Sequence, residues 1–165
     1  MVQNQTDPAI ISNHRSHDHE QCQSEALDAA RLICARRGTR LTEMRQRVLE
    51  LIWNGHSAVK AYDLLEMLSA PDRAVRPPTV YRALEFLLEN RLIHRIESLN
   101  AYVGCPSPGE SHVSQFLICE NCAVVTELLG QDIARLVRAE ADQHGFLIRR
   151  QTVEVHGLCQ QCQAA

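Results

Sequence analysis

Residues 76–104 read RPPTVYRALEFLLENRLIHRIESLNAYVG, and this stretch decides the fold of the first half of the chain. Proline fits the first turn of a helix, so the Pro-Pro pair after Arg76 predicts a helix start. Two short strands follow, over residues 92–98 and 101–104, and Leu99-Asn100 joins them as a β-hairpin. The apolar face of the helix comprises Val80, Ala83, Leu84, Leu87 and Leu88.

Three more helices are predicted before this stretch, because apolar residues recur there every three to four positions. Ser24 is the expected N-cap of the first helix, and Thr42 is the expected N-cap of the second; the third covers residues 61–69. Four helices followed by a hairpin outline a winged helix-turn-helix, in which one helix enters the DNA major groove. We therefore predict a mainly α winged-helix domain over residues 24–104, preceded by a flexible tail over residues 1–23.

The second half of the chain has a different character. Pro106-Ser107-Pro108-Gly109 predicts a break, so residues 105–111 are assigned as a hinge. Beyond it, a small α+β domain is predicted over residues 112–165. A domain of this size has a marginal core and usually needs a staple or a partner. Its expected elements are strands over 115–119, 123–128 and 146–156 and a helix over 131–144.

The composition is that of a globular chain. Of the 165 residues, 45% are hydrophobic and 22% are charged, which excludes disorder throughout. No apolar run approaches the ~20 residues that a membrane helix needs, and the N-terminus lacks the apolar segment of a secretory signal. We therefore expect a cytoplasmic protein with no membrane partner. In that reducing compartment, the seven cysteines are expected to be thiols or metal ligands rather than disulfides.

The net charge of −3 conceals a basic cluster. Six arginines fall between residues 31 and 47, where Glu43 is the only acidic residue. Such a cluster can face a polyanion, although charge alone leaves a solvated helix face as the alternative. The six are Arg31, Arg36, Arg37, Arg40, Arg45 and Arg47.

Two Cys-x-x-Cys pairs give the strongest chemical signal. Each pair, Cys119/Cys122 and Cys159/Cys162, places two thiolates on one tight turn, so that both can reach one ion at about 2.3 Å. The 36 residues between the pairs match a strand, a helix and a strand, so the pairs can meet as a four-cysteine zinc site. Such a site would pin the last strand to the first. A redox dithiol is the alternative, but it would need only one pair.

Four further side chains suited to zinc lie outside the first set. His94 lies on the first strand of the hairpin, Cys105 follows the second strand, and His112 and Glu127 lie beyond the Pro/Gly break. A thiolate and a carboxylate balance the charge of Zn²⁺, and the thiolate favours zinc over manganese or magnesium. A site shared by these four would join the two halves. Spacing also leaves open two surface histidines and a buried, apolar Cys105.

In combination, these motifs closely resemble the ferric uptake regulator superfamily, and the zinc uptake regulator branch fits best. The matching features are the helix start at Arg76, the hairpin with His94 and Cys105, and both Cys-x-x-Cys pairs; the resemblance spans residues 27–162. It implies a homodimeric, metal-dependent repressor of zinc uptake genes. The implied architecture is an N-terminal winged-helix domain, a hinge and a C-terminal α/β dimerisation domain.

The resemblance also implies two zinc ions per subunit, carried over motif by motif. The structural zinc would be held by Cys119, Cys122, Cys159 and Cys162. The regulatory zinc at the hinge would be held by His94, Cys105, His112 and Glu127, and would close the dimer into an operator-binding geometry.

The implied partners are a double-stranded DNA operator and a second copy of the chain, with no small-molecule substrate. Tyr62 and Arg82 match residues that contact operator bases, and Thr79 and Tyr81 lie beside Arg82 on the expected recognition helix. The arginines expected to contact phosphates are Arg36, Arg37, Arg40 and Arg45.

Other functions remain open at this point. A sensor of iron, manganese, nickel or peroxide in the same superfamily is one alternative, and a thiol redox sensor is another. An enzyme is not expected, because the His-x-Glu signature of zinc deaminases and the His-Glu-x-x-His motif of metalloproteases are absent. A further weak metal site could come from His14, His17 and His19, although a solvated tail is the expected interpretation.

Overall fold

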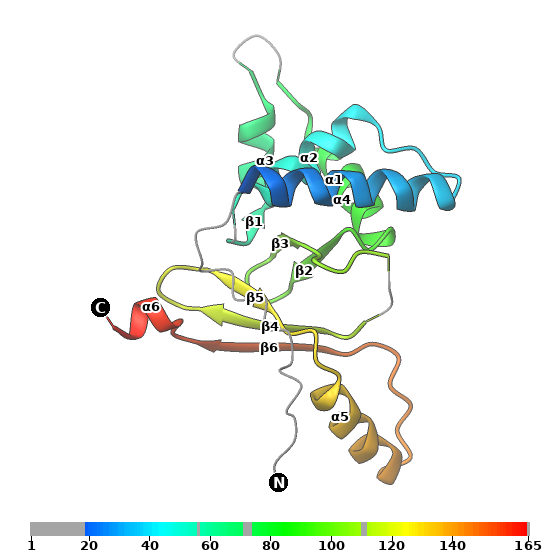
Figure 1. Cartoon of the computed structure of the whole chain (residues 1–165), viewed down its shortest axis with the longest axis vertical. Coiled ribbons are helices and arrows are strands. Elements are labelled where there is room, and N and C mark those ends of the chain that lie inside the picture. The colour runs from blue at the N-terminus through cyan, green and yellow to red at the C-terminus, as the bar shows by residue number, and fades with distance from the viewer. Residues whose placement is uncertain (1–18, 56, 71–73, 110–111, 165) are drawn as a thin grey trace, which may run out of the picture.

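A computed structural model of the chain describes residues 19–55, 57–70, 74–109 and 112–164. The elements form two units, each with its own three-stranded sheet (Figure 1). The N-terminal unit comprises α1 (His19–Arg36), α2 (Glu43–Trp53), β1 (Val59–Lys60), α3 (Ala61–Leu68), α4 (Pro77–Glu89), β2 (Ile93–Ile96) and β3 (Ala101–Gly104). The C-terminal unit comprises β4 (Ser114–Cys119), β5 (Val125–Glu127), α5 (Asp132–Gln143), β6 (Thr152–Gly157) and α6 (Gln160–Gln163).

The predicted α+β composition is confirmed, and so are the helix starts at residues 42–43 and 76–77. α4 begins at Pro77, directly after Arg76, and α2 begins after Thr42, although the Thr42 side chain makes no capping hydrogen bond. The hairpin pairs β2 with β3 in antiparallel register, and Asn100 adopts a positive φ of 48° in the turn. Asparagine tolerates this left-handed conformation better than most residues, which suits it to the turn.

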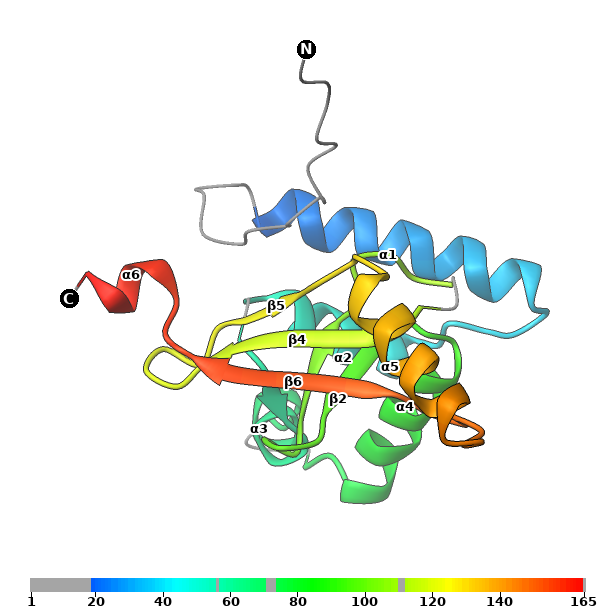
Figure 2. The same cartoon turned by 90° about the horizontal axis from the view of Figure 1, so that it is seen from below.

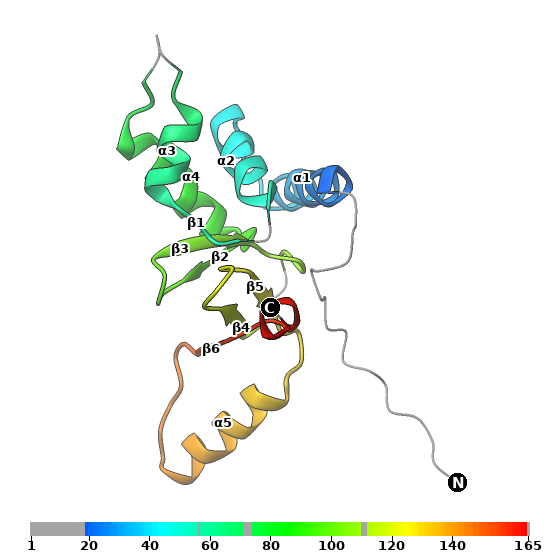
Figure 3. The same cartoon turned by 90° about the vertical axis from the view of Figure 1, so that its left-hand side faces the viewer.

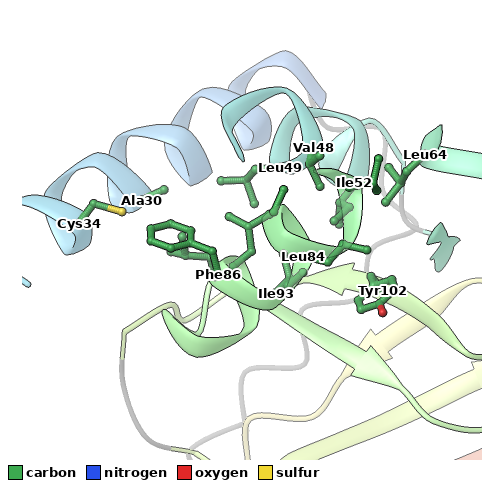
Figure 4. Packing of buried hydrophobic residues seen from close by; sticks show 14 residues of the cluster. Ala30, Cys34, Val48, Leu49, Ile52, Leu64, Leu84, Phe86, Ile93 and Tyr102 are labelled. Carbon is green, nitrogen blue, oxygen red and sulfur yellow. The ribbon is translucent and has the colours of Figure 1, made fainter. Parts of the chain in front are cut away.

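The main core lies between α1, α2, α4 and the hairpin (Figure 4). Val48, Leu49 and Ile52 of α2 are buried, as their helical spacing predicts. Leu84 and Leu87 of α4 pack into the same cluster. No helix within the described ranges is long and apolar enough to cross a membrane.

A smaller apolar cluster joins the two units. Ile96 of β2 and Phe116 of β4 are both fully buried, and Ile118 and Val125 complete the cluster from the C-terminal sheet. Figure 3 shows the hairpin between the helices and this sheet. Burying one such side chain contributes about 1.5–3 kcal/mol, so the contact between the units is energetically substantial. We call this cluster the apolar seam.

β4 is the central strand of the C-terminal sheet (Figure 2). It pairs antiparallel with β5 and parallel with β6, and α5 makes the crossover that a parallel pair requires. The prediction that the last strand starts at residue 146 is wrong, since β6 starts at Thr152. Thr152 pairs with Ser114, the first residue of β4, so earlier residues have no strand opposite them.

The predicted N-cap at Ser24 is also wrong. α1 begins at His19, so Ser24 lies inside the helix and residues 19–23 of the predicted tail are helical. The side-chain amide of Gln23 donates a 2.8 Å hydrogen bond to the Glu50 backbone carbonyl, which ties the start of α1 to α2. The rest of the predicted tail, with His14 and His17, lies outside the described residues.

Candidate metal centres

The two Cys-x-x-Cys pairs meet at one end of the C-terminal sheet. Cys119 ends β4 and Cys122 lies in the turn before β5, while Cys159 and Cys162 lie at the start of α6. The parallel pairing of β4 with β6 sets Cys119 opposite Gly157. This register brings the end of β4 close to the start of α6. We call the set Cys119, Cys122, Cys159 and Cys162 the four-cysteine cluster.

The four sulfur atoms of this cluster fit one tetrahedral ion. They lie within 4.8 Å of one another, and the Sγ atoms of Cys122 and Cys159 are 3.7 Å apart. A zinc ion with Zn–S bonds of ~2.3 Å separates its sulfurs by about 3.8 Å. The predicted convergence of the two pairs is therefore present, and their roles as zinc ligands stay a prediction.

Ionisation within the four-cysteine cluster is uneven. Backbone hydrogen bonds at Cys122 and Cys159 lower the pKa of Cys119 to about 6, so it is a thiolate at neutral pH. A hydrogen bond from Asn121 lowers the pKa of Cys162, but Cys159, burial and Cys122 together raise it to about 12. Burial and the neighbouring cysteine side chains thus disfavour ionisation of Cys162. A divalent cation reverses this effect, because a coordinated thiol loses its proton.

A second cluster lies where the two units meet. The N-terminal unit provides His94 from β2 and Cys105 directly after β3, and the C-terminal unit provides Glu127 from β5 and His112 just before β4. One ligand atom from each of the four lies within 4.8 Å of the others. We call this set the inter-unit cluster. The structure brings together all four residues that the sequence singled out.

The ligand atoms of the inter-unit cluster converge on one point, as they do around a bound cation. The Nε2 atoms of His94 and His112 are 3.1 Å apart, and they lie 3.1 Å and 3.0 Å from Oε1 of Glu127. Cys105 Sγ lies 3.6 Å from His112 Nε2. Ligand atoms around tetrahedral zinc are about 3.3–3.8 Å apart, close to this arrangement. Glu127 is buried; its Oε1 faces the two imidazoles, and its Oε2 receives no hydrogen bond from any described residue.

Ser114 contacts His94, one of the candidate ligands of the inter-unit cluster, and the sequence analysis does not predict this contact. Its hydroxyl lies 3.1 Å from Nδ1 of His94. A hydrogen bond donated by Nδ1 fixes the tautomer that leaves the Nε2 lone pair for a metal. A single serine at the start of a strand carries no distinguishing pattern, so only the pairing of the strands around it could reveal this contact.

Cys105 is deeply buried and its surroundings are tightly packed. It is 1% exposed, and burial together with the negative charge of Glu127 raises the pKa of its thiol to about 12. The neighbouring Gly104 lies against Trp53 of α2, and a methyl group at position 104 would overlap the indole ring. Glycine is therefore required where the hairpin leaves the core and delivers Cys105 to the cluster.

The residues predicted to contact DNA lie on the N-terminal unit, and most are exposed. Tyr62 of α3 is 67% exposed and Tyr81 of α4 is 57% exposed, and Thr79 and Arg82 of α4 are exposed as well. α3 and α4 lie at the opposite end of the molecule from α5 (Figure 3). Their contacts with DNA stay predictions.

The four predicted phosphate-binding arginines divide into two groups. Arg36 and Arg40 have exposed side chains. Arg37 donates to the Glu89 carbonyl and to Asn90 at the end of α4, with distances of 3.2 Å and 3.4 Å. The Arg45 guanidinium lies 3.5 Å from the centre of the Phe86 ring, a cation–π contact. These last two side chains already have partners that support the packing of the helices.

Residues 36–156 match the sequence profile of the Ferric uptake regulator family. The chain belongs to this family. One relative, the zinc uptake regulation protein of Escherichia coli (strain K12), is 41% identical over 139 residues, which cover 84% of this chain and 81% of the relative. The resemblance that the sequence motifs indicate is therefore confirmed.

Three solved structures whose sequences are 40–44% identical to this chain also match its fold. A zinc uptake regulator complexed with zinc and DNA matches with a TM-score of 0.81 and 40% identity, over 86% of this chain and 95% of that one. Holo XcZur matches with a TM-score of 0.78 and 44% identity, over 87% and 99%. Apo XcZur matches with a TM-score of only 0.51 at 42% identity, over 87% and 98%. The chain is thus closer in shape to the holo form than to the apo form.

We expect Cys119→Ser to unfold the C-terminal unit. Metal-binding energy at such a site is folding energy, on the order of 10 kcal/mol, and serine does not replace the thiolate. Circular dichroism, gel filtration and zinc content measure the outcome. Cys22→Ser is the matched control, because Cys22 lies outside both clusters. A folded Cys119→Ser protein with its full zinc content would contradict the structural assignment.

Zinc binding by the inter-unit cluster should strengthen as the pH rises. The pKa of Cys105 is raised to about 12, so its thiol is protonated at neutral pH and must release one proton to bind the metal. Zinc affinity should therefore increase about tenfold per pH unit between about pH 7 and 9. Competition with a chelator of known proton dependence measures it. Cys105→Ala should lose this pH-dependent binding; an unchanged affinity and slope would exclude Cys105 as a ligand.

Proposed function

We propose that this protein is a zinc-responsive, DNA-binding repressor of zinc uptake genes. The observation that carries the proposal is the inter-unit cluster, which draws two ligands from each unit. Further support comes from the identity of 41% with the E. coli zinc uptake regulation protein and from the likeness to a zinc uptake regulator complexed with zinc and DNA. A regulator of this kind needs no catalytic residues, and we do not propose an enzyme activity.

The N-terminal unit would read DNA as a winged helix, with α4 as the recognition helix and the β2–β3 hairpin as the wing. The exposed face of α4 supports this role, because Arg82 carries a guanidinium fork suited to O6 and N7 of guanine. Tyr62 and Tyr81 offer large exposed aromatic groups on the same part of the unit. Arg36 and Arg40 are free to approach the DNA backbone, where they would contribute affinity without base specificity.

His94, Cys105, His112 and Glu127 would hold the regulatory zinc. A bound zinc ion supplies the double positive charge that lets a thiolate, a carboxylate and two imidazoles share one buried point. Because two of these side chains belong to each unit, their convergence fixes the angle between the units. The closer match to holo than to apo XcZur supports the view that the described arrangement is the metal-bound one.

The fixed angle would matter because the active form is a homodimer. α5 stands away from the rest of the subunit and leaves Leu136 69% exposed, with Phe146 and Leu147 more than half exposed beyond it (Figure 1). A monomer rarely leaves such an apolar surface in water, so a second copy is its proposed occupant. In a dimer, the angle between units sets the separation of the two recognition helices, and operator half-sites accept only a defined spacing.

Zinc is favoured over the other signals of the family by the ligand set. Cys105 provides a thiolate, which suits zinc better than manganese. Thiol oxidation is a weaker alternative, because both Cys-x-x-Cys pairs belong to one four-sulfur cluster with the geometry of a zinc site. The free thiols that the ligands require are consistent with the proposed cytoplasmic location.

The test is a titration of DNA binding with zinc, iron(II) and manganese(II) under reducing conditions. The DNA is a duplex that the zinc-loaded protein selects from a random-sequence library. We expect zinc, at lower concentration than the other metals, to tighten binding roughly 5- to 150-fold. Iron or manganese acting at lower concentration than zinc would instead indicate a sensor of that metal.

Cys105→Ser should separate regulation from folding. We expect this variant to keep about one zinc per subunit and an intact dimer, but to lose zinc-stimulated binding, because only the inter-unit cluster is broken. Zinc content, gel filtration and the same DNA titration measure this. Cys22→Ser makes the same chemical change outside both clusters and should behave as the wild type. A normal zinc response in Cys105→Ser would remove Cys105 from the mechanism.

Arg82→Ala should weaken binding to the selected duplex and relax one base position. The loss of a bidentate contact costs about 1–3 kcal/mol. Arg40→Ala should instead weaken binding to all sequences alike and reduce the dependence on salt. Affinities for a set of single-base variants of the duplex distinguish the two effects. Arg138→Ala on α5 is the control, and an Arg82→Ala protein with unchanged base preference would contradict the role of Arg82.

A further inference from the structure

A carboxylate of the C-terminal unit holds the tip of the β2–β3 hairpin. Oε1 of Glu154 accepts a 2.7 Å hydrogen bond from the Glu97 backbone N–H, and Oε2 accepts a 3.0 Å hydrogen bond from the Ser98 backbone N–H. Glu154 lies in β6, and Glu97 and Ser98 follow β2 at the turn of the hairpin. The two bonds therefore cross from one unit to the other.

We propose that Glu154 is a positioning residue, which fastens the hairpin tip to the C-terminal unit and acts with the inter-unit cluster to orient the DNA-binding unit. This inference rests on the proposed function. Nothing in the sequence around Glu154 sets it apart from a surface glutamate on a strand. Its partners are backbone groups 56 and 57 residues away along the chain, and only the fold brings them together.

The position of Glu154 complements that of the metal ligands. His94 and Cys105 lie toward the base of the hairpin, and Glu97 lies three residues beyond His94, roughly 10 Å along an extended strand. One attachment point would let the hairpin pivot about the metal. Two separated points, with the apolar seam at Ile96 between them, define its direction. The metal and Glu154 thus restrict different rotations of the same element.

Charge strengthens the two hydrogen bonds of this contact, both of which are exposed to solvent. A carboxylate that accepts bonds from two backbone N–H groups forms charge-assisted hydrogen bonds. Burial raises the pKa of Glu154, but the hydrogen bonds from Ser98 and Glu97, with the nearby His156, lower it overall, so the group is charged at neutral pH. The adjacent Arg150–Glu97 ion pair, at 3.4 Å, is different, because the Arg150 side chain is 80% exposed and such pairs contribute little.

The experiment compares Glu154→Gln with Glu97→Gln in the full-length protein. Glutamine at position 154 keeps the size of the side chain but loses the charge and one acceptor oxygen. The control at position 97 removes the ion pairs of Glu97 with Arg95 and Arg150 and leaves its backbone N–H in place. Each protein is checked for zinc content and dimer formation, and Glu154→Ala repeats the test if Glu154→Gln does not fold. The two probes are zinc and the duplex that the zinc-loaded wild-type protein selects from a random-sequence library.

We expect Glu154→Gln to weaken DNA binding by the zinc-loaded protein about 5- to 30-fold. By linkage, zinc affinity at the inter-unit cluster should fall as well, since both ligands favour the same arrangement. Glu97→Gln should stay within about twofold of the wild type on both measures. A residue that merely supports folding would not couple DNA and zinc affinities in this way.

Amide hydrogen exchange provides a readout that does not depend on DNA. The Glu97 and Ser98 amides should be protected in the zinc-loaded wild type and lose protection in Glu154→Gln, while the amides of β4 stay protected. Unprotected amides in the wild type, or unchanged DNA and zinc affinities in Glu154→Gln, would overturn the proposal. A wild type without zinc-dependent DNA binding would count against the proposed function instead, and the exchange measurement would still test the contact.

Discussion

The structure depends on one constraint: four side chains suited to a metal, two from each unit, converge on one buried point in the inter-unit cluster. Glu127 and Cys105 are almost inaccessible to water, and two imidazole nitrogens face the same centre. Removing a carboxylate from water without compensation is strongly unfavourable. A cation at the centre resolves this conflict, and the contact between the hairpin and the C-terminal sheet is built around the point where it would lie.

The two candidate metal sites use similar chemistry but differ in where their ligands originate. Both pairs of the four-cysteine cluster belong to the C-terminal unit, one at the end of β4 and the other after β6. A zinc ion bound there would close a small unit that has little core of its own, so its binding energy would contribute to folding. The inter-unit cluster divides its ligands between the units. A metal bound there would therefore act on the relative orientation of the units, which a DNA-binding dimer would need to control.

Much of the fold could be predicted from local patterns. The Pro-Pro pair after Arg76 marks the start of α4, and the Cys-x-x-Cys spacing identifies the four-cysteine cluster, because both signals are short in sequence. The starts of α1 and β6 were predicted wrongly, since contacts with α2 and with β4 decide them. His94 and Glu127 lie 33 residues apart in sequence, so spacing alone does not predict that their side chains are close in the fold. Only the family resemblance favours this proximity. No sequence pattern predicts the contacts of Ser114 and Glu154, because their hydrogen-bond partners come from remote parts of the chain.

The apolar seam has a thermal consequence. If closure buries Ile96 and Phe116 against each other, it removes hydrocarbon surface from water and carries a negative heat-capacity change. The free energy gained from burying this apolar surface becomes smaller on cooling. The metal must then supply a larger share of the closing energy in the cold. We therefore expect the metal concentration needed for closure to rise as the temperature falls.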